Sequence, residues 1–263
     1  MQATVKMGVL GPLVLDRGGQ SRVPSAPKPR QLLALLMINA NQMVRASDCL
    51  VELWDTQPPK SAMSTLQTYV LHLRRVLGET SNEDHGPALM TMNQGYQLEA
   101  NRLDLDCFVF EDLARRGSEA ARTGDHRRAS SLFAEALRLW RGPALADVRP
   151  GPLSLPLLIE LEEARKYVLE QRIEADLRLN RHHELLDELE TLTKAHPTNE
   201  NLHAQFMIAL YRAGMSTRAL TVFRGLCRTL EDDLGFEPGP RIQRLHQAVL
   251  SEHPALGVPT LRA

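Results

Sequence analysis

The spacing of apolar residues changes near residue 100, and this change sets the fold class. Before it, "KMGVLGPLVLDRGGQSRVP" (6–24) has short apolar runs broken by Gly-Pro and Gly-Gly pairs, which predicts small strands joined by turns. After it, apolar residues recur at helical spacing to about residue 250. We therefore predict a mainly α protein with two domains. The first spans residues 1–100 and the second 101–252, with a flexible tail over 253–263.

The first domain has the pattern of a winged helix-turn-helix. Dense apolar positions predict a buried helix over 30–38, and "ASDCLVELW" (46–54) predicts a second helix with Ser47 as its N-cap. A third helix is predicted over 61–78. After it, "ALMTMNQGYQLEA" (88–100) alternates around Gly95, as a hairpin does. A small β-sheet, three helices and a C-terminal hairpin wing in this order are typical of the fold.

The pattern of the second domain predicts helical hairpins. Thr123-Gly124-Asp125 interrupts one helical stretch, and Asn180 and Gly214 lie at helix–helix turns 34 positions apart. A period of about 34 residues is typical of tetratricopeptide repeats. The matches are imperfect, so we expect a degenerate, all-α, tetratricopeptide-like domain.

The third predicted helix has two chemically different faces. At 100° per residue, Met63, Leu66, Val70, Leu73 and Leu77 form one stripe, which we expect to be buried. The opposite face is centred on short hydroxyls, one leucine and one arginine. Residues 57–78 hold three basic side chains and no acid.

Such a face suits the DNA major groove, where short polar side chains reach base edges and a leucine can meet a thymine methyl. An ordinary solvated face is the alternative, with the arginines favoured by the helix C-terminus. The residues expected to contact DNA are Lys60, Ser61, Ser64, Thr65, Gln67, Thr68, Leu71, His72, Arg74 and Arg75, with Asn93 and Gln94 at the hairpin tip.

Charge limits the affinity that we expect for DNA. The whole chain carries −1, and residues 1–100 hold nine Lys and Arg against eight Asp and Glu. Sequence-independent attraction to phosphates is therefore small, and we expect a second copy or another protein to assist.

Other clusters predict no enzyme, metal or cofactor. His182 and His183 are adjacent, so they diverge by 100° on a helix and suit an exposed turn better than one metal ion. The acidic run 231–233 predicts a solvated loop. Three distant cysteines fit a reducing cytoplasm, and no apolar run is long enough to span a membrane.

Several segments resemble the SARP family of actinomycete antibiotic regulators. They are "GVLGPL", "PKPRQLLALLMINAN", "LVELWDTQPPKSAMSTLQTYVLHLRRVLG" and "GYQL". "LDLDCF", "GDHRRASSLFAEALRLWRGPALAD", "ALYRAGMSTRAL" and "LEDDLGFEPGPRIQRLHQAVL" resemble the bacterial transcriptional activation domain of that family. Together they cover roughly residues 5–252.

The resemblance implies a nucleoid-associated activator of a secondary-metabolite gene cluster. It would bind direct repeats in promoter DNA with a second copy of itself and recruit RNA polymerase holoenzyme. The loop between the second and third helices would contact the polymerase through Asp55, Thr56 and Gln57, while Trp54 is expected to anchor the core. His72 and the tip "MNQGY" are less basic than in many relatives, so the operator cannot be carried over.

A rival interpretation is a helical-repeat adaptor whose winged domain binds protein instead of DNA. The near-neutral first domain favours it. An enzyme is the third possibility, and it lacks a recognisable site.

Overall fold

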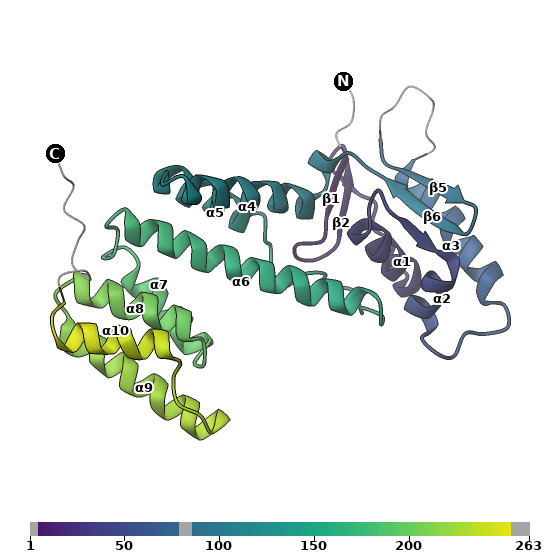
Figure 1. Cartoon of the computed structure of the whole chain (residues 1–263). Helices are drawn as coiled ribbons and strands as arrows, with labels where there is room; N and C mark the ends of the chain where they lie inside the picture. Colours follow the sequence, from purple (N-terminus) through teal and green to yellow (C-terminus); the bar gives the residue numbers. More distant parts are fainter. Residues whose placement is uncertain (1–4, 79–85, 254–263) are drawn as a thin grey trace. The chain divides into compact units, whose positions relative to one another are not determined.

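The computed structural model describes residues 5–78 and 86–253 (Figure 1). They divide into two compact units. Unit 1 contains residues up to 115 together with 135–167, and unit 2 contains 116–134 together with 168 onward. All but the first residue of the predicted tail lies outside the described residues, and the predicted boundary near residue 100 stays a prediction.

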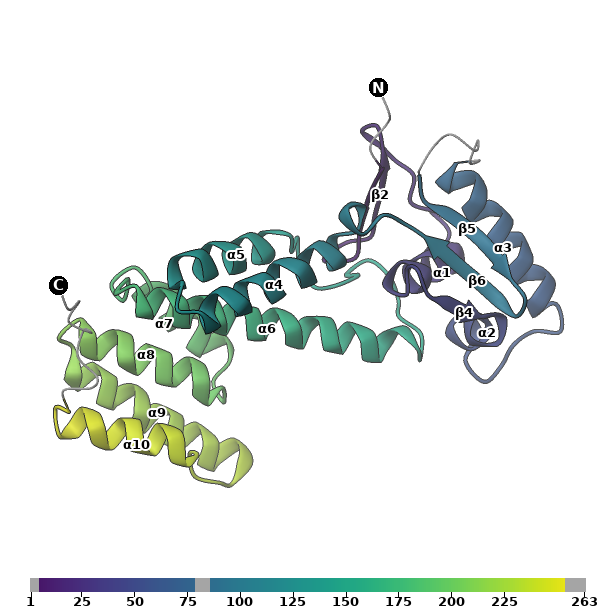
Figure 2. The ribbon, with the colours of Figure 1, turned by 45° about the horizontal axis from the view of Figure 1, so that its top comes forward.

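The winged helix-turn-helix predicted for the first hundred residues is confirmed. Two antiparallel sheets have the strand orders β1-β2-β3 and β4-β6-β5, and in Figure 2 the second sheet lies beside α3. The elements are β1 (Val5–Gly8), β2 (Val14–Arg17), β3 (Gln20–Ser21), α1 (Pro27–Ile38), β4 (Met43–Arg45), α2 (Ala46–Trp54), α3 (Ala62–Leu77), β5 (Ala88–Met92) and β6 (Gly95–Glu99).

The rest of the chain is helical. The turns Gly124, Asn180 and Gly214 adopt left-handed backbone angles, with φ of 83°, 61° and 76°. This conformation ends a helix and favours Gly or Asn. The elements are a 3-10 turn (Arg102–Asp104), α4 (Asp106–Arg122), α5 (His126–Arg138), α6 (Ser154–Arg178), α7 (Leu186–Ala195), α8 (Glu200–Arg212), α9 (Ser216–Leu234) and α10 (Pro240–Leu250).

The core of the winged helix follows the apolar pattern closely. Residues 31–37 of α1 are all buried, and α3 buries Leu66, Val70, Leu73 and Leu77. One expectation is wrong, because Met63 is 46% exposed and the buried position in that turn belongs to Ala62. Met63 lies at the edge of the apolar stripe, so a small rotation of the helix is enough to expose it.

Three further expectations need correction. Ser47 lies inside α2, and Arg45 occupies the N-cap position. The acidic run 231–233 belongs to α9, which continues to Leu234. His182 is buried, with 7% of its surface exposed, while His183 is exposed.

A buried carboxylate from α2 caps the N-terminus of α6. Glu52 is 2% exposed. Its oxygens accept hydrogen bonds from the backbone amides of Gly151, Leu153 and Ser154 at 2.8–3.0 Å, and from the Ser154 hydroxyl at 2.6 Å. The first amides of a helix lack partners within the helix, and a negative charge there also suits the helix dipole. We call this contact the Glu52 cap.

A second carboxylate ties the N-terminal sheet to the helical segment of unit 1. Asp106 accepts from the Val9 amide at 2.8 Å and the Leu10 amide at 3.2 Å, and its Oδ2 lies 2.7 Å from Arg141 Nη2. Burial raises the pKa of Asp106, and these hydrogen bonds and Arg141 oppose that rise. The winged helix is thus joined to the start of the helical segment by the buried Glu52 cap and by partly buried contacts of Asp106, all within one unit.

We predict that Glu52→Gln destabilises unit 1. The amide would keep one acceptor but place its NH2 group against backbone N–H donors, so we expect a loss of about 2 kcal/mol in the free energy of unfolding. Trp54 and Trp140 are the two tryptophans of the chain, and both lie in unit 1. Their fluorescence during urea unfolding measures the effect. Glu99→Gln, on an exposed strand end, is the control, and an equal midpoint for the two variants would contradict the prediction.

We also predict that unit 2 loses stability as the pH falls below about 6.5. Burial is the main cause that lowers the pKa of His203 from its ordinary value of 6.5, and burial lowers those of His182 and His246 as well. In the unfolded chain the same histidines have higher pKa values, so they bind protons at a higher pH than in the folded chain. Acidification therefore favours unfolding. Circular dichroism during urea unfolding at pH 7.5 and 5.5 tests this, with His203→Gln reducing the difference between the two midpoints. An unchanged difference in that variant would reject the assignment to His203.

Candidate nucleic-acid interface

The face of α3 turned away from the core carries the residues expected from the sequence. Ser64, Gln67, Thr68, His72 and Arg75 are exposed. Leu71 joins them with 49% of its surface exposed. Lys60 and Ser61 are exposed immediately before the helix, whereas Thr65 is half-buried on its flank.

The two central hydroxyls already donate their protons within the helix. Ser64 Oγ donates to the Ser61 carbonyl at 2.9 Å, and Thr68 Oγ1 donates to the Ser64 carbonyl at 3.0 Å. Each oxygen keeps lone pairs that can accept a further hydrogen bond. In this state the pair presents acceptors, which match the exocyclic amino groups of cytosine and adenine in the major groove.

Arg74, which is also among the residues expected to contact DNA, makes hydrogen bonds within the domain. Its Nε donates to the Leu89 carbonyl at 2.9 Å and its Nη2 to the Thr91 hydroxyl at 2.6 Å. The guanidinium therefore joins α3 to strand β5 of the hairpin. Arg75, the next residue, extends from the exposed face.

The hairpin tip is held by its backbone. Asn93 and Gln94 are exposed, and the Gln94 carbonyl accepts from the Ala46 amide at 2.9 Å. A Cβ added at Gly95 would lie 2.1 Å from the Val44 carbonyl oxygen, so only glycine allows the strands this close approach. Tyr96 is 8% exposed and belongs to the core.

Strand pairing brings further side chains to this region that sequence reasoning missed. Arg45 and Met92 are both register partners of Gly95, so they flank the hairpin tip, and Arg45 is exposed. Met43 and Met90 both pair with Gln97, and each is 44% exposed. No local pattern marks Arg45, because its place beside the hairpin depends on pairing between β4 and β6.

The loop between α2 and α3 is exposed from Asp55 to Lys60. Asp55 has a left-handed backbone, with φ of 55°, which ends α2. Trp54, expected to anchor the core, is half-buried and stacks on Tyr69 with 6.3 Å between ring centroids. Asp55, Gln57 and Trp54 also line a cavity of about 570 Å³ in unit 1.

The part of the chain that the structure describes shows neither a cluster of metal ligands nor a helix suited to cross a membrane. Within residues 5–78 and 86–253, no three His, Cys, Asp or Glu side chains gather closely enough to hold a metal ion. Over the same residues, no helix is both long and apolar enough to cross a membrane.

Comparisons with known proteins agree with this architecture. Residues 105–250 match the bacterial transcriptional activator domain, and residues 19–98 match the C-terminal domain of transcriptional regulatory proteins. The regulatory protein DnrI of Streptomyces peucetius is 45% identical over 96% of this chain and 94% of its own length. The transcriptional regulator RedD of Streptomyces coelicolor is 33% identical over 97% of this chain and 73% of its own.

A solved structure shows the same fold. Mycobacterium tuberculosis EmbR, in complex with a low-affinity phosphopeptide, superposes with a TM-score of 0.90 at 33% identity. The match covers 96% of this chain and 66% of the EmbR chain. Both domain matches and these relatives are of transcriptional regulators, so the chain belongs to the SARP family of transcriptional activators and is not an enzyme.

Proposed function

We propose that this activator binds promoter DNA with α3 in the major groove and the β5–β6 hairpin as a wing beside it. The observation that carries the proposal is the exposed face of α3. It combines the exposed hydroxyl residues Ser64 and Thr68, an exposed leucine and Arg75, and the helix contains no acidic residue. A carboxylate on this face would repel phosphates, so its absence along the whole helix favours DNA.

Each part of the face has a chemical role in this proposal. Ser64, Thr68 and Gln67 read base edges, and Leu71 packs on a thymine methyl. Arg75 and His72 reach guanine or phosphate, while Lys60, Ser61 and Thr65 lie nearer the backbone at the N-terminal end. Arg74 acts mainly by positioning the wing, so that Asn93 and Gln94 donate to minor-groove acceptors or phosphates.

Low charge makes cooperation part of the mechanism. Because the first hundred residues carry a net charge of only +1, one copy gains little from counterion release. Two copies arranged head to tail on direct repeats, about one helical turn apart, would occupy one face of the duplex. By analogy with SARP relatives, the target is the promoter of a secondary-metabolite cluster on the nucleoid.

The same arrangement presents the α2–α3 loop for contact with RNA polymerase holoenzyme. Asp55, Thr56 and Gln57 are exposed at one end of the recognition helix, while Trp54 behind them is fixed by Tyr69. A rigid base under an exposed loop suits a contact that must form while α3 is occupied by DNA.

We predict that Thr68→Ala and Arg75→Ala weaken DNA binding in different ways. The probe is a set of duplexes selected from a random library by the wild-type chain, measured by mobility shift. A lost base-edge contact at Thr68 should cost about 1–3 kcal/mol and relax specificity at one position. Arg75→Ala should do the same if it reads guanine, or weaken all sequences alike and reduce the salt slope if it binds phosphate.

Arg127→Ala, an exposed arginine on α5, is the matched control and should leave binding unchanged. Unchanged binding in both α3 variants would rule out this face. The rival adaptor function predicts little dependence on salt, so a steep loss of DNA affinity between 50 and 200 mM salt would reject it.

We predict that Asp55→Ala with Gln57→Ala lowers activation without lowering DNA affinity. Run-off transcription from a promoter carrying the selected repeats, with purified holoenzyme, measures activation, and mobility shift with the same duplex measures binding. Truncating these exposed side chains should reduce transcript several-fold. Equal loss in both assays would instead place the loop in DNA binding, and equal transcript from wild type and variant would remove it from the polymerase contact.

A further inference from the structure

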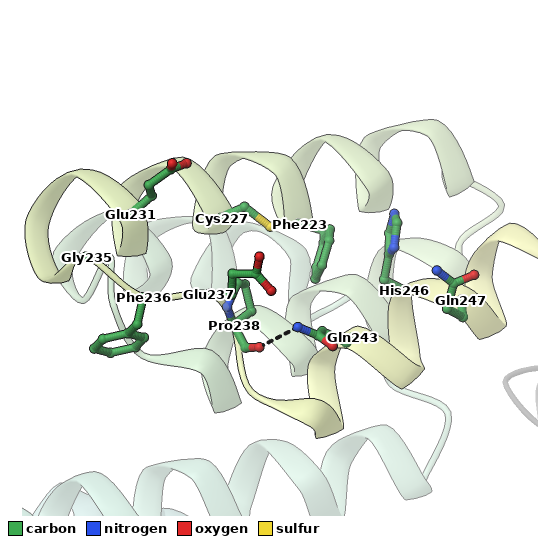
Figure 3. A pocket seen from close by; sticks show the side chains of 10 residues that line it. All are labelled: Phe223, Cys227, Glu231, Gly235, Phe236, Glu237, Pro238, Gln243, His246 and Gln247. Carbon is green, nitrogen blue, oxygen red and sulfur yellow. Dashed lines mark hydrogen bonds between the residues drawn. The ribbon is translucent and has the colours of Figure 1, made fainter.

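A groove between α9 and α10 in unit 2 lies outside the proposed function, but its chemistry selects no ligand. Its volume is about 510 Å³. The rings of Phe223 and His246 stack on each other with 4.0 Å between their centroids, and Figure 3 shows the Phe236 ring directed away from the Glu237 carboxylate. A more specific arrangement lies in unit 1, around Arg45.

Arg45 lies where the second sheet meets the hairpin tip. It is the last residue of β4 and comes directly before α2. Strand pairing places it opposite Gly95, which begins β6 immediately after the tip, whereas Met43 pairs further from the tip. Val44 is buried and Arg45 is exposed, so the Arg45 side chain extends from the face of the sheet that is turned away from the core.

The main chain fixes Arg45 relative to the tip. A Cβ added at Gly95 would lie 2.8 Å from the Arg45 Cα, so the two backbones are in close contact. The amide of Ala46 donates to the Gln94 carbonyl at 2.9 Å. The start of α2, the Arg45 side chain and the hairpin tip are therefore held together by backbone geometry.

The Arg45 guanidinium has no hydrogen bond or ion pair with any of the described residues. It stands at the N-cap position of α2 but makes no capping hydrogen bond. The nearest acid in sequence on this helix is Asp48, which accepts from the Ser47 hydroxyl at 3.1 Å and forms no salt bridge with Arg45. Within the described part of the chain, the charge of Arg45 thus has no structural partner.

We propose that Arg45 binds one phosphate of the DNA backbone, on the strand between the groove that receives α3 and the groove that receives the hairpin tip. This inference rests on the proposed function. The first helix of a helix-turn-helix motif crosses the DNA backbone, and Arg45 directly precedes that helix, α2. The positive end of the helix dipole favours an anion at the same place, and a guanidinium can bind two phosphate oxygens at once.

The contact would supply charge that α3 provides only sparingly. Residues 57–78 hold three basic side chains, and one of them, Arg74, is hydrogen-bonded to β5. A phosphate contact by Arg45 would also fix the wing against the duplex without reading a base.

The test uses the whole chain and the duplexes selected by it, in mobility shifts between 50 and 200 mM salt. Arg45→Ala should weaken binding about three- to tenfold for all sequences alike and lower the salt slope by about 1, because one phosphate contact is lost. Arg45→Lys keeps the charge and should retain most of the slope. Lys6→Ala removes one exposed positive charge from β1, in the other sheet, and should leave the slope unchanged.

A second series of duplexes locates the phosphate. One phosphate at a time is replaced by an uncharged methylphosphonate. At one position beside the site of the hairpin tip, the wild-type chain should lose about as much affinity as Arg45→Ala causes, and the variant should lose little more. Because Arg45 makes no capping hydrogen bond, Arg45→Ala should unfold in urea at the wild-type midpoint, as followed by tryptophan fluorescence.

The outcomes separate this inference from the proposed function. Equal salt slopes for wild type and Arg45→Ala, or equal further losses in both proteins at every methylphosphonate position, would overturn the role of Arg45 and leave the role of α3 standing. A loss confined to duplexes changed at one base pair would also overturn it, because Arg45 would then read a base. Absence of DNA binding by the wild-type chain would reject both.

Discussion

The Glu52 cap decides how the DNA-binding and helical parts of this activator are connected. A carboxylate buried in the winged helix satisfies the first amides of α6, a hundred residues later in the chain. Removing an ion from water is unfavourable unless hydrogen bonds replace the hydration, and here four donors do so. Asp106 and Arg141 add a second polar link between the N-terminal segment and the helices of the same unit. Both links are made by side chains that reach across about a hundred or fewer residues of sequence.

The surface of α3 that we propose for DNA contact carries little charge. In the proposed complex, its two hydroxyl groups and one exposed leucine would act only at short range, so their placement would matter more than attraction at a distance. Arg74 is one of only three Lys and Arg residues between positions 57 and 78, and it joins α3 to strand β5 of the hairpin through two hydrogen bonds.

The sequence predicted the elements well where a repeating pattern determines burial. The stripe of α3, the glycine hairpin and the turns at Gly124, Asn180 and Gly214 all follow from local spacing. Prediction from the sequence failed where contacts with distant segments determine whether a side chain is buried and what it meets. Helical spacing does place Glu52 beside Cys49 and Leu53 on the buried face of α2, yet nothing local shows that distant amides would meet it. Likewise, the exposure of Met63, the burial of His182 and the place of Arg45 depend on neighbours supplied by other segments.

The close approach at Gly95 has a consequence for how such regulators diversify. Because the backbone of β4 leaves no room for a Cβ there, the path of the wing is fixed by main-chain geometry and owes nothing to the two residues at its tip. Asn93 and Gln94 can therefore be exchanged for other polar or basic side chains while the frame stays the same. In the proposed complex, a change at these two positions would alter what the hairpin tip offers to DNA without moving the strands that carry it.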